Sequence, residues 1–220
     1  LLTAADSDGV HTRLDRAAVT ADYGKWVTLE LGRDRLWYGP GRFGSMLITD
    51  YARPYDYLKT KLSRGLWTYE GLDTTGLRRA DTAFMAHKVE VAHSPTVRFG
   101  IAETVVASGG KLPLDYAVAA LVPVLPFQVV DHLGKNEDNP VASVYVETDL
   151  AKGYQTYVEF LLDDFVVRSR ETSRNRTGFL FGSYWHDSEQ PDRLNIRLEY
   201  ARLDPGVYGP RDSNEAYFDL

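Results

Sequence analysis

The chain has 220 residues, a formal net charge of −6, 14 tyrosines and no cysteine. This length suits one large domain, or part of one. An acidic chain has no overall attraction for phosphate backbones, so we expect no nucleic acid partner. The lack of cysteine excludes disulfides, thiolate metal sites and a cysteine nucleophile.

The first third of the chain is rich in short apolar segments. In one of them Val27, Leu29 and Leu31 alternate with polar residues, which is the period of a half-buried strand. A segment before it alternates poorly and is predicted as a weak strand. The strands predicted here are residues 10–20, 25–36, 45–49 and 57–69.

The middle of the chain predicts a hairpin and a helix. Residues 83–92 and 96–107 alternate as strands on either side of a Ser94-Pro95 turn. Glu103 is the one charge on the apolar side of the second strand. Residues 114–122 are the best helical candidate, ending before two prolines that cannot continue a helix.

Four more strands are predicted in the last third, over residues 141–148, 154–167, 178–186 and 193–202. The last separates apolar from polar most cleanly, with Leu198 on one side and Glu199 on the other. A soluble sandwich would bury the apolar side, whereas a membrane barrel would turn it toward lipid. The alternation is the same in both folds.

A membrane helix is not expected. The most apolar run, residues 116–127, contains two prolines and is shorter than the ~20 residues that a spanning helix needs. A barrel strand needs only about 9 to 11 residues, and roughly ten strands would use up the chain. Tyrosine and tryptophan are abundant enough for interfacial girdles, although sugar-binding clefts use them equally well.

The most detailed motif is WYGPGRFGSMLITDYARP, residues 37–54. Glycine adopts positive φ freely and proline fixes φ, so the Gly39-Pro40-Gly41 core predicts a tight, irregular turn. Two later motifs accompany it. The first contains two pairs of polar residues that each begin with an aspartate, and the second combines acidic with apolar residues. They are Asp131-His132 with Asp138-Asn139, and EFLLDDF with Glu159, Asp163 and Asp164.

Together these motifs resemble the signature of the capsule assembly Wzi family. The resemblance implies a bacterial outer-membrane β-barrel that holds capsular polysaccharide and is not an enzyme. Wzi-like barrels are larger than ten strands, so residues 1–220 are expected to be a single barrel domain, or a portion of a larger barrel. Within the turn motif, Trp37, Arg42 and Asp50 are expected to be held by hydrogen bonds in a turn folded into the lumen.

The sequence gives little support for a catalytic site or for a metal site. Asp163 and Asp164 could supply a carboxylate pair for glycoside hydrolysis, but neighbours on a strand point to opposite faces. Residues 131–139 carry oxygen ligands without the pattern of an EF-hand, so a self-capped turn is favoured. The histidines lack HExxH spacing, and Ser45 lacks the glycines of a nucleophile elbow. We expect no metal and no cofactor.

The candidate ligand-binding residues are Arg168, Arg170, Arg174 and Arg176. Their even spacing would direct all four side chains to one side of an extended chain. Guanidinium groups bind carboxylates in bidentate fashion, which suits an acidic polysaccharide. The alternative is a solvated hairpin tip.

The sequence therefore predicts an all-β, antiparallel up-and-down transmembrane β-barrel in the bacterial outer membrane, with at most one or two short helices. Its expected partners are surface polysaccharide and outer-membrane lipid. Two alternatives remain open at this point. One is a soluble β-sandwich that binds or hydrolyses carbohydrate, and the other is a general diffusion porin.

Overall fold

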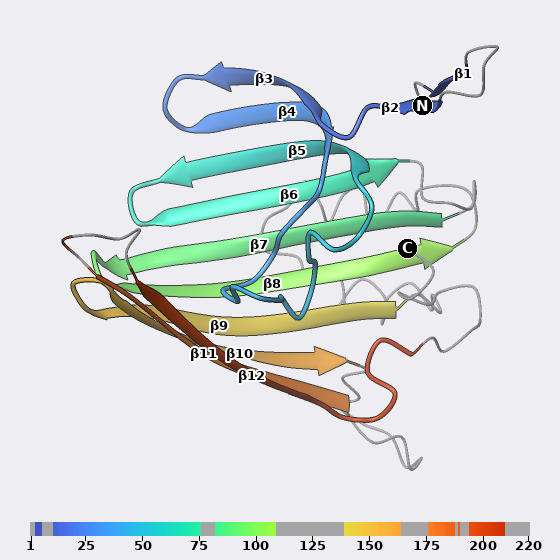
Figure 1. The fold of residues 1–220 in the computed structure, drawn as a ribbon. Helices are drawn as coiled ribbons and strands as arrows, with labels where there is room; N and C mark the ends of the chain where they lie inside the picture. Colours follow the sequence, from blue (N-terminus) through green and yellow to red (C-terminus); the bar gives the residue numbers. More distant parts are fainter. Residues whose placement is uncertain are drawn as a thin grey trace, which may run out of the picture.

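The computed structural model describes residues 3–5, 11–75, 82–108, 139–163, 176–187, 189 and 194–209. Ten strands form one antiparallel sheet in which each strand pairs with its neighbours in sequence (Figure 1). They are β3 (Ala17–Tyr23), β4 (Val27–Asp34), β5 (Tyr55–Arg64), β6 (Trp67–Thr75), β7 (Thr82–Ser94), β8 (Val97–Ser108), β9 (Asn139–Ala151), β10 (Tyr154–Asp163), β11 (Arg176–His186) and β12 (Asn195–Leu203). A separate pair consists of β1 (Thr3–Ala5) and β2 (His11–Arg13). The prediction of an all-β, up-and-down fold is confirmed.

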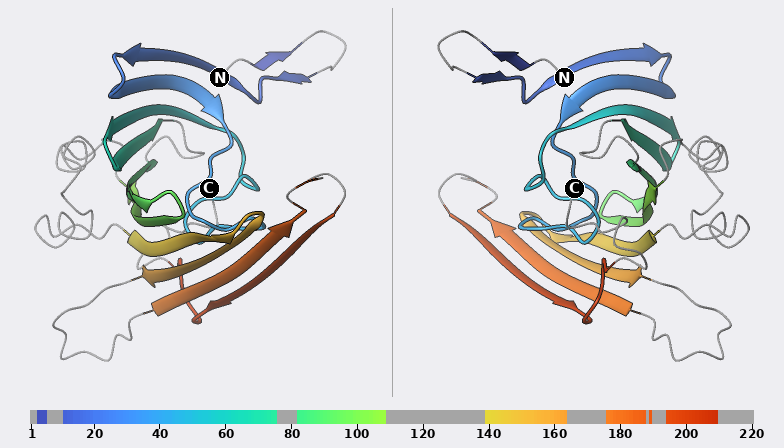
Figure 2. Two further views of the ribbon diagram at one scale, coloured as in Figure 1. Left: turned by 90° about the vertical axis from the view of Figure 1, so that its left-hand side faces the viewer. Right: turned by 90° about the vertical axis from the view of Figure 1, so that its right-hand side faces the viewer.

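The large sheet is strongly curled. Seen along the strands, it bends around the segment of residues 35–54, which lies on its concave side (Figure 2). Within the described residues β3 and β12 are not paired with each other, so the sheet is open rather than closed. A single curled sheet is the form of a β-barrel wall, and it differs from the two stacked sheets of a sandwich.

Apolar side chains cover much of the convex, outer face. On β8, Ile101 is 57% exposed on this face whereas the next residue, Ala102, faces inward and is fully buried. Alternation of side chains along each strand produces this division. Other exposed apolar residues of the outer face are Val19, Leu31, Leu58, Val144, Phe160, Phe181 and Leu198.

One part of the outer face is buried. Glu103, the single charge predicted on the apolar side of its strand, lies opposite His87 on β7. Its Oε2 atom is 3.1 Å from His87 Nε2, and both residues are almost fully buried. A buried carboxylate needs such a partner, so the pairing accounts for the charge that interrupts the pattern.

The two ends of the sheet differ in their connections. Short turns after β3, β5, β7 and β9 all lie at one end (Figure 1). Longer connections, including residues 35–54, leave from the opposite end. Aromatic side chains of the outer face lie near the short-turn end of the strands. They are Tyr23, Trp67, Phe99, Tyr154 and Trp185.

On the inner face, tyrosines lie over glycines of the neighbouring strand. Tyr145 is directly opposite Gly100, which is opposite Glu90 on the next strand. A Cβ atom on Gly100 would overlap the Tyr145 ring. The ring therefore crosses one strand, and its hydroxyl donates to Glu90 Oε1 at 2.8 Å.

The same arrangement recurs further along the sheet. Tyr157 lies over Gly182 and donates to Glu199 Oε1 at 2.5 Å, on the strand beyond. Each glycine gives space to an aromatic ring, and each ring reaches a carboxylate that pairs with its hydroxyl. These contacts link three consecutive strands through side chains as well as backbone.

Several predicted boundaries are wrong. Residues 57–69 are not one strand, because Gly65, with φ of 61°, turns the chain between β5 and β6. Residues 45–49 form no strand and contribute only the isolated bridge between Tyr38 and Ile48. The helix predicted at residues 114–122 lies outside the described residues. In the described parts of the chain, no helix is long and apolar enough to span a bilayer.

Candidate functional site

The segment of residues 35–54 fills the concave side of the sheet. It closes on itself through the bridge in which Tyr38 N donates to Ile48 O at 3.0 Å. Tyr38 and Ile48 pack against β5 to β8, whereas Met46 packs against β9 to β11. Leu47 contacts both apolar clusters. The segment is therefore fixed to both sides of the curl.

Glycine is required where this segment approaches Glu159. Gly39 has φ of 133°, which side chains rarely permit. A Cβ atom there would lie 3.1 Å from Glu159 Oε2. Glu159 is fully buried, and its Oε2 accepts a hydrogen bond from Met46 N at 3.3 Å. The expected turn folded into the concave interior is thus present, and Glu159 supports it.

Glu199, on β12, binds the tip of the segment. Its Oε1 accepts from Arg42 N at 2.5 Å and its Oε2 accepts from Phe43 N at 3.0 Å. Tyr157 OH donates to the same carboxylate. A carboxylate that accepts from adjacent main-chain amides fixes the position of the residue between them, so Glu199 orients Arg42.

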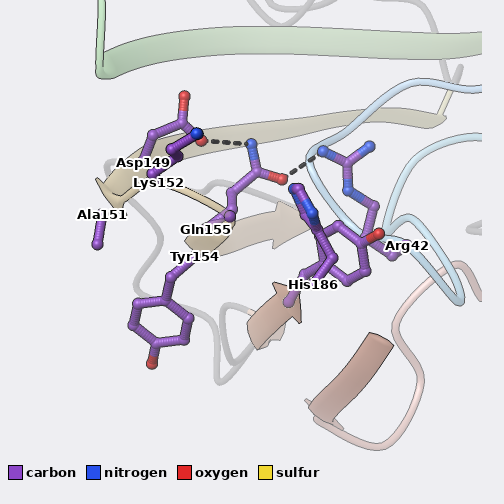
Figure 3. A pocket seen from close by; sticks show the side chains of 9 residues that line it. Arg42, Asp149, Ala151, Lys152, Tyr154, Gln155 and His186 are labelled. Carbon is purple, nitrogen blue, oxygen red and sulfur yellow. Dashed lines mark hydrogen bonds between the residues drawn. The ribbon is translucent and has the colours of Figure 1, made fainter. Parts of the chain in front are cut away.

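The Arg42 side chain reaches two further residues. Its Nη2 atom is 3.2 Å from Glu147 Oε1 and donates to Gln155 Oε1. Gln155 in turn donates to Asp149 Oδ1 at 3.0 Å. This series of hydrogen-bonded polar side chains leads from the segment of residues 35–54 to the turn between β9 and β10 (Figure 3).

An open cavity of about 390 Å³ lies at that turn. We call it the mouth pocket. It is lined by Arg42, Asp149, Ala151, Lys152, Gly153, Tyr154, Gln155, Tyr184 and His186. Its size falls in the range of small-molecule sites, roughly 300 to 1,000 Å³. The pocket lies at the short-turn end of the sheet, although Arg42 belongs to a segment that starts from the other end (Figures 1 and 3).

Aromatic groups form one wall of the mouth pocket. The Tyr184 and His186 rings are 5.5 Å apart between centroids. Arg197 lies over the Tyr184 ring at 5.1 Å. His186 Nδ1 is 3.2 Å from the carbonyl of Asp187, so Nδ1 carries the proton and Nε2 is left for other contacts. A wall of this kind suits the apolar face of a sugar ring.

The burial and the hydrogen bond of Asp163 are those of a residue with a structural role. It is fully buried, and its Oδ2 accepts from Tyr208 N at 2.7 Å. Tyr208 OH donates to Met46 O at 2.5 Å, and this bond connects the residues after β12 to the segment of residues 35–54. Burial raises the pKa of the Tyr208 hydroxyl, and the charges of Glu159 and Asp163 raise it further. The hydroxyl therefore stays protonated and able to donate.

The structure brings together part of the predicted signature. Trp37 Nε1 donates to Gly39 O at 3.2 Å, and Pro40 is buried beside it. Gly41 packs closely against Gly44. Asp50 takes part through its main-chain carbonyl, which accepts from Arg35, rather than through its exposed carboxylate.

The other predicted residues are elsewhere or not described. Asn139 is the first residue of β9. Arg176 begins β11 and donates to the carbonyls of Gly206 and Gly209. The residues that lie outside the described ranges are Asp131, His132, Asp138, Asp164, Arg168, Arg170 and Arg174. Ligand binding by the arginines stays a prediction.

The sequence analysis did not find most of the pocket. Gln155, Lys152 and Tyr184 belong to predicted strands and turns, and no local spacing sets them apart. Glu199 lay on the polar side of its strand, but its main-chain partners Arg42 and Phe43 are more than a hundred residues away. Among the residues that the structure describes, no group of acidic or histidine side chains is arranged to hold a metal ion.

An up-and-down curled sheet with an exposed apolar outer face, and with residues 35–54 packed on its inner side, has the form of part of a β-barrel wall. The sequence matches the family model of the capsule assembly protein Wzi over residues 1–219. The chain therefore belongs to the Wzi family, and the resemblance seen in its motifs is confirmed. The family assignment indicates a role in capsule assembly. No curated protein and no solved structure matches the chain significantly.

Proposed function

We propose that this chain forms the wall of a β-barrel in the bacterial outer membrane and assists capsule assembly by binding polysaccharide, without catalysis. The observation that carries the proposal is the outer face, where exposed apolar residues such as Ile101 and Leu198 are bordered by aromatic residues at the short-turn end. Lipid is the solvent that favours such a surface, and aromatic girdles mark its interfaces.

The lengths of the connections between strands support one end of the sheet as the end that binds polysaccharide. Outer-membrane barrels have short periplasmic turns and longer extracellular loops. Arg168, Arg170 and Arg174 belong to the connection between β10 and β11, which leaves from the end with the longer connections. In the proposed orientation this end of the sheet faces the cell exterior, and the guanidinium groups of the connection would bind the carboxylates of an acidic capsule.

A binding role rather than hydrolysis is supported by the state of the acidic residues. Glycosidase carboxylates must contact the glycosidic bond. Glu159 and Asp163 are fully buried, and each accepts a hydrogen bond from the main chain. Their positions favour a structural role.

The interior argues against a general diffusion porin. Such a channel needs a continuous aqueous lumen. Here the segment of residues 35–54 packs on both walls of the curl through Tyr38 and Met46. A fixed segment in this position would obstruct passage.

Refolding in detergent tests the membrane location. The unfolded chain, diluted into detergent micelles, should give a band whose mobility on gels changes on heating, because closed barrels resist dodecyl sulfate until heated. The control is the same dilution without detergent. A folded monomer in that control would contradict the outer-membrane proposal, since the apolar outer face would then be stable in water.

Polysaccharide binding is tested with the arginine connection. The triple variant Arg168→Gln, Arg170→Gln, Arg174→Gln should retain less acidic capsular polysaccharide on the surface of intact cells, with about a tenfold weaker affinity from the loss of charge-assisted hydrogen bonds. Arg202→Gln, which changes an exposed arginine on the outer face of β12, is the matched control. Equal retention by wild type, triple variant and control would remove this segment as the binding site.

A further inference from the structure

We propose that the mouth pocket is a second binding site, which takes a sugar unit bearing a carboxylate, and that Lys152 selects for this charge. The pocket lies at the short-turn end of the sheet, opposite to the connection that carries Arg168. None of its lining residues belongs to the arginine-rich segment. The inference rests on the proposed role in polysaccharide binding, but it concerns different residues.

Lys152 is the cation that remains available in this pocket. It lies in the turn between β9 and β10 and is exposed. Within the described part of the chain, no carboxylate lies within ion-pair distance of its amine, and Asp149 Oδ1 accepts from Gln155 instead. An amine at the rim of a cavity attracts an anionic group as a point charge.

The wall behind Lys152 carries charges of both signs. Glu147 lies between two arginines, at 3.2 Å from Arg42 and 3.6 Å from Arg98. One carboxylate cannot neutralise two guanidinium groups. Glu199 accepts from two main-chain amides and from Tyr157, whereas Arg197 adds a further positive charge over Tyr184. Counted with Asp149, the three arginines face three carboxylates, so among these groups Lys152 is the cation in excess.

Other features favour a sugar over a simple anion. Asp149 contributes a carboxylate to the lining, which can accept hydrogen bonds from the hydroxyls of a sugar. Gln155 is oriented at both ends, by Asp149 and by Arg42. Tyr184 supplies an aromatic surface beside these polar groups. A cation for the carboxylate, an acceptor for hydroxyls and a ring surface together match a uronic acid.

Calorimetric titration of the detergent-folded chain with an oligogalacturonate tests the proposal. Lys152→Gln should weaken binding about tenfold, because a charge-assisted hydrogen bond is lost. Lys25→Gln, in the exposed turn between β3 and β4 at the same end, should leave the affinity unchanged. Lys152→Arg should bind nearly as tightly as the wild type. A neutral oligosaccharide of equal length and inorganic phosphate should each bind at least about tenfold more weakly than the uronate.

Two results would overturn the inference. One is an affinity for oligogalacturonate that Lys152→Gln does not change. The other is binding of the neutral oligosaccharide or of phosphate as tightly as the uronate. If surface retention still depends on Arg168, Arg170 and Arg174, either result would leave the proposed function intact. If no polysaccharide binds the chain at either end, the proposed function fails as well.

Discussion

The inner and outer faces of the same sheet differ in which kinds of side chain are buried and which are exposed. On β11, Phe181 is 44% exposed on the outer face, whereas its neighbour Gly182 is buried under the Tyr157 ring on the inner face. On the inner face, charged residues such as Glu159 are buried and hydrogen-bonded. The outer face places large apolar residues at the surface. Polarity alone therefore does not decide which side chains of this chain are buried. In the proposed function the outer face is surrounded by hydrocarbon.

The largest effect should come from a charge on the outer face. Ile101→Arg is expected to destabilise the lipid-inserted protein by about 2 to 4 kcal/mol, because arginine near the bilayer centre loses its hydration. Urea unfolding in lipid vesicles measures this loss, and Ile101→Leu is the size-matched control. A free energy of unfolding that Ile101→Arg leaves unchanged would show that this face is in water.

A smaller effect is expected from a methyl group on the inner face. Gly100→Ala should cost roughly 1 to 3 kcal/mol, because the new Cβ atom must displace the Tyr145 ring. Gly44→Ala is the control, since a Cβ atom there meets nothing within 4 Å. The double variant with Tyr145→Ala should recover part of the cost in a mutant cycle. Purely additive costs would show that the ring and the glycine are not coupled.

The smallest effect should come from deleting one hydroxyl. Tyr157→Phe removes a donor from Glu199 and should cost about 1 kcal/mol, because the two main-chain donors of that carboxylate remain. Tyr200→Phe changes an exposed tyrosine on the outer face of β12 and should be neutral. The two variants are compared by urea unfolding. Equal effects would remove the distinction between buried inner and exposed outer tyrosines.

Local pattern predicted most of the strands. The hairpin at Ser94-Pro95 and the division of β12 into an apolar and a polar side are both confirmed, because side chains alternate along any extended strand. Gly65 was missed as a turn because the residues on both sides of it continue to favour strand. Residues 45–49 favour strand as well, but tertiary packing holds them as an irregular segment across the interior.

The sequence by itself determined most of the strands, their two unlike faces and a tight turn at Gly39-Pro40-Gly41. Tertiary structure decided that the apolar face lies on the outside of one curled sheet, and that Arg42, which lines the mouth pocket, meets Glu147, Gln155 and Glu199. The physical reason is that a period of two fixes which residues share a face, but not what lies against that face. Contacts between residues more than a hundred positions apart depend on the curl of the sheet, which no local pattern contains.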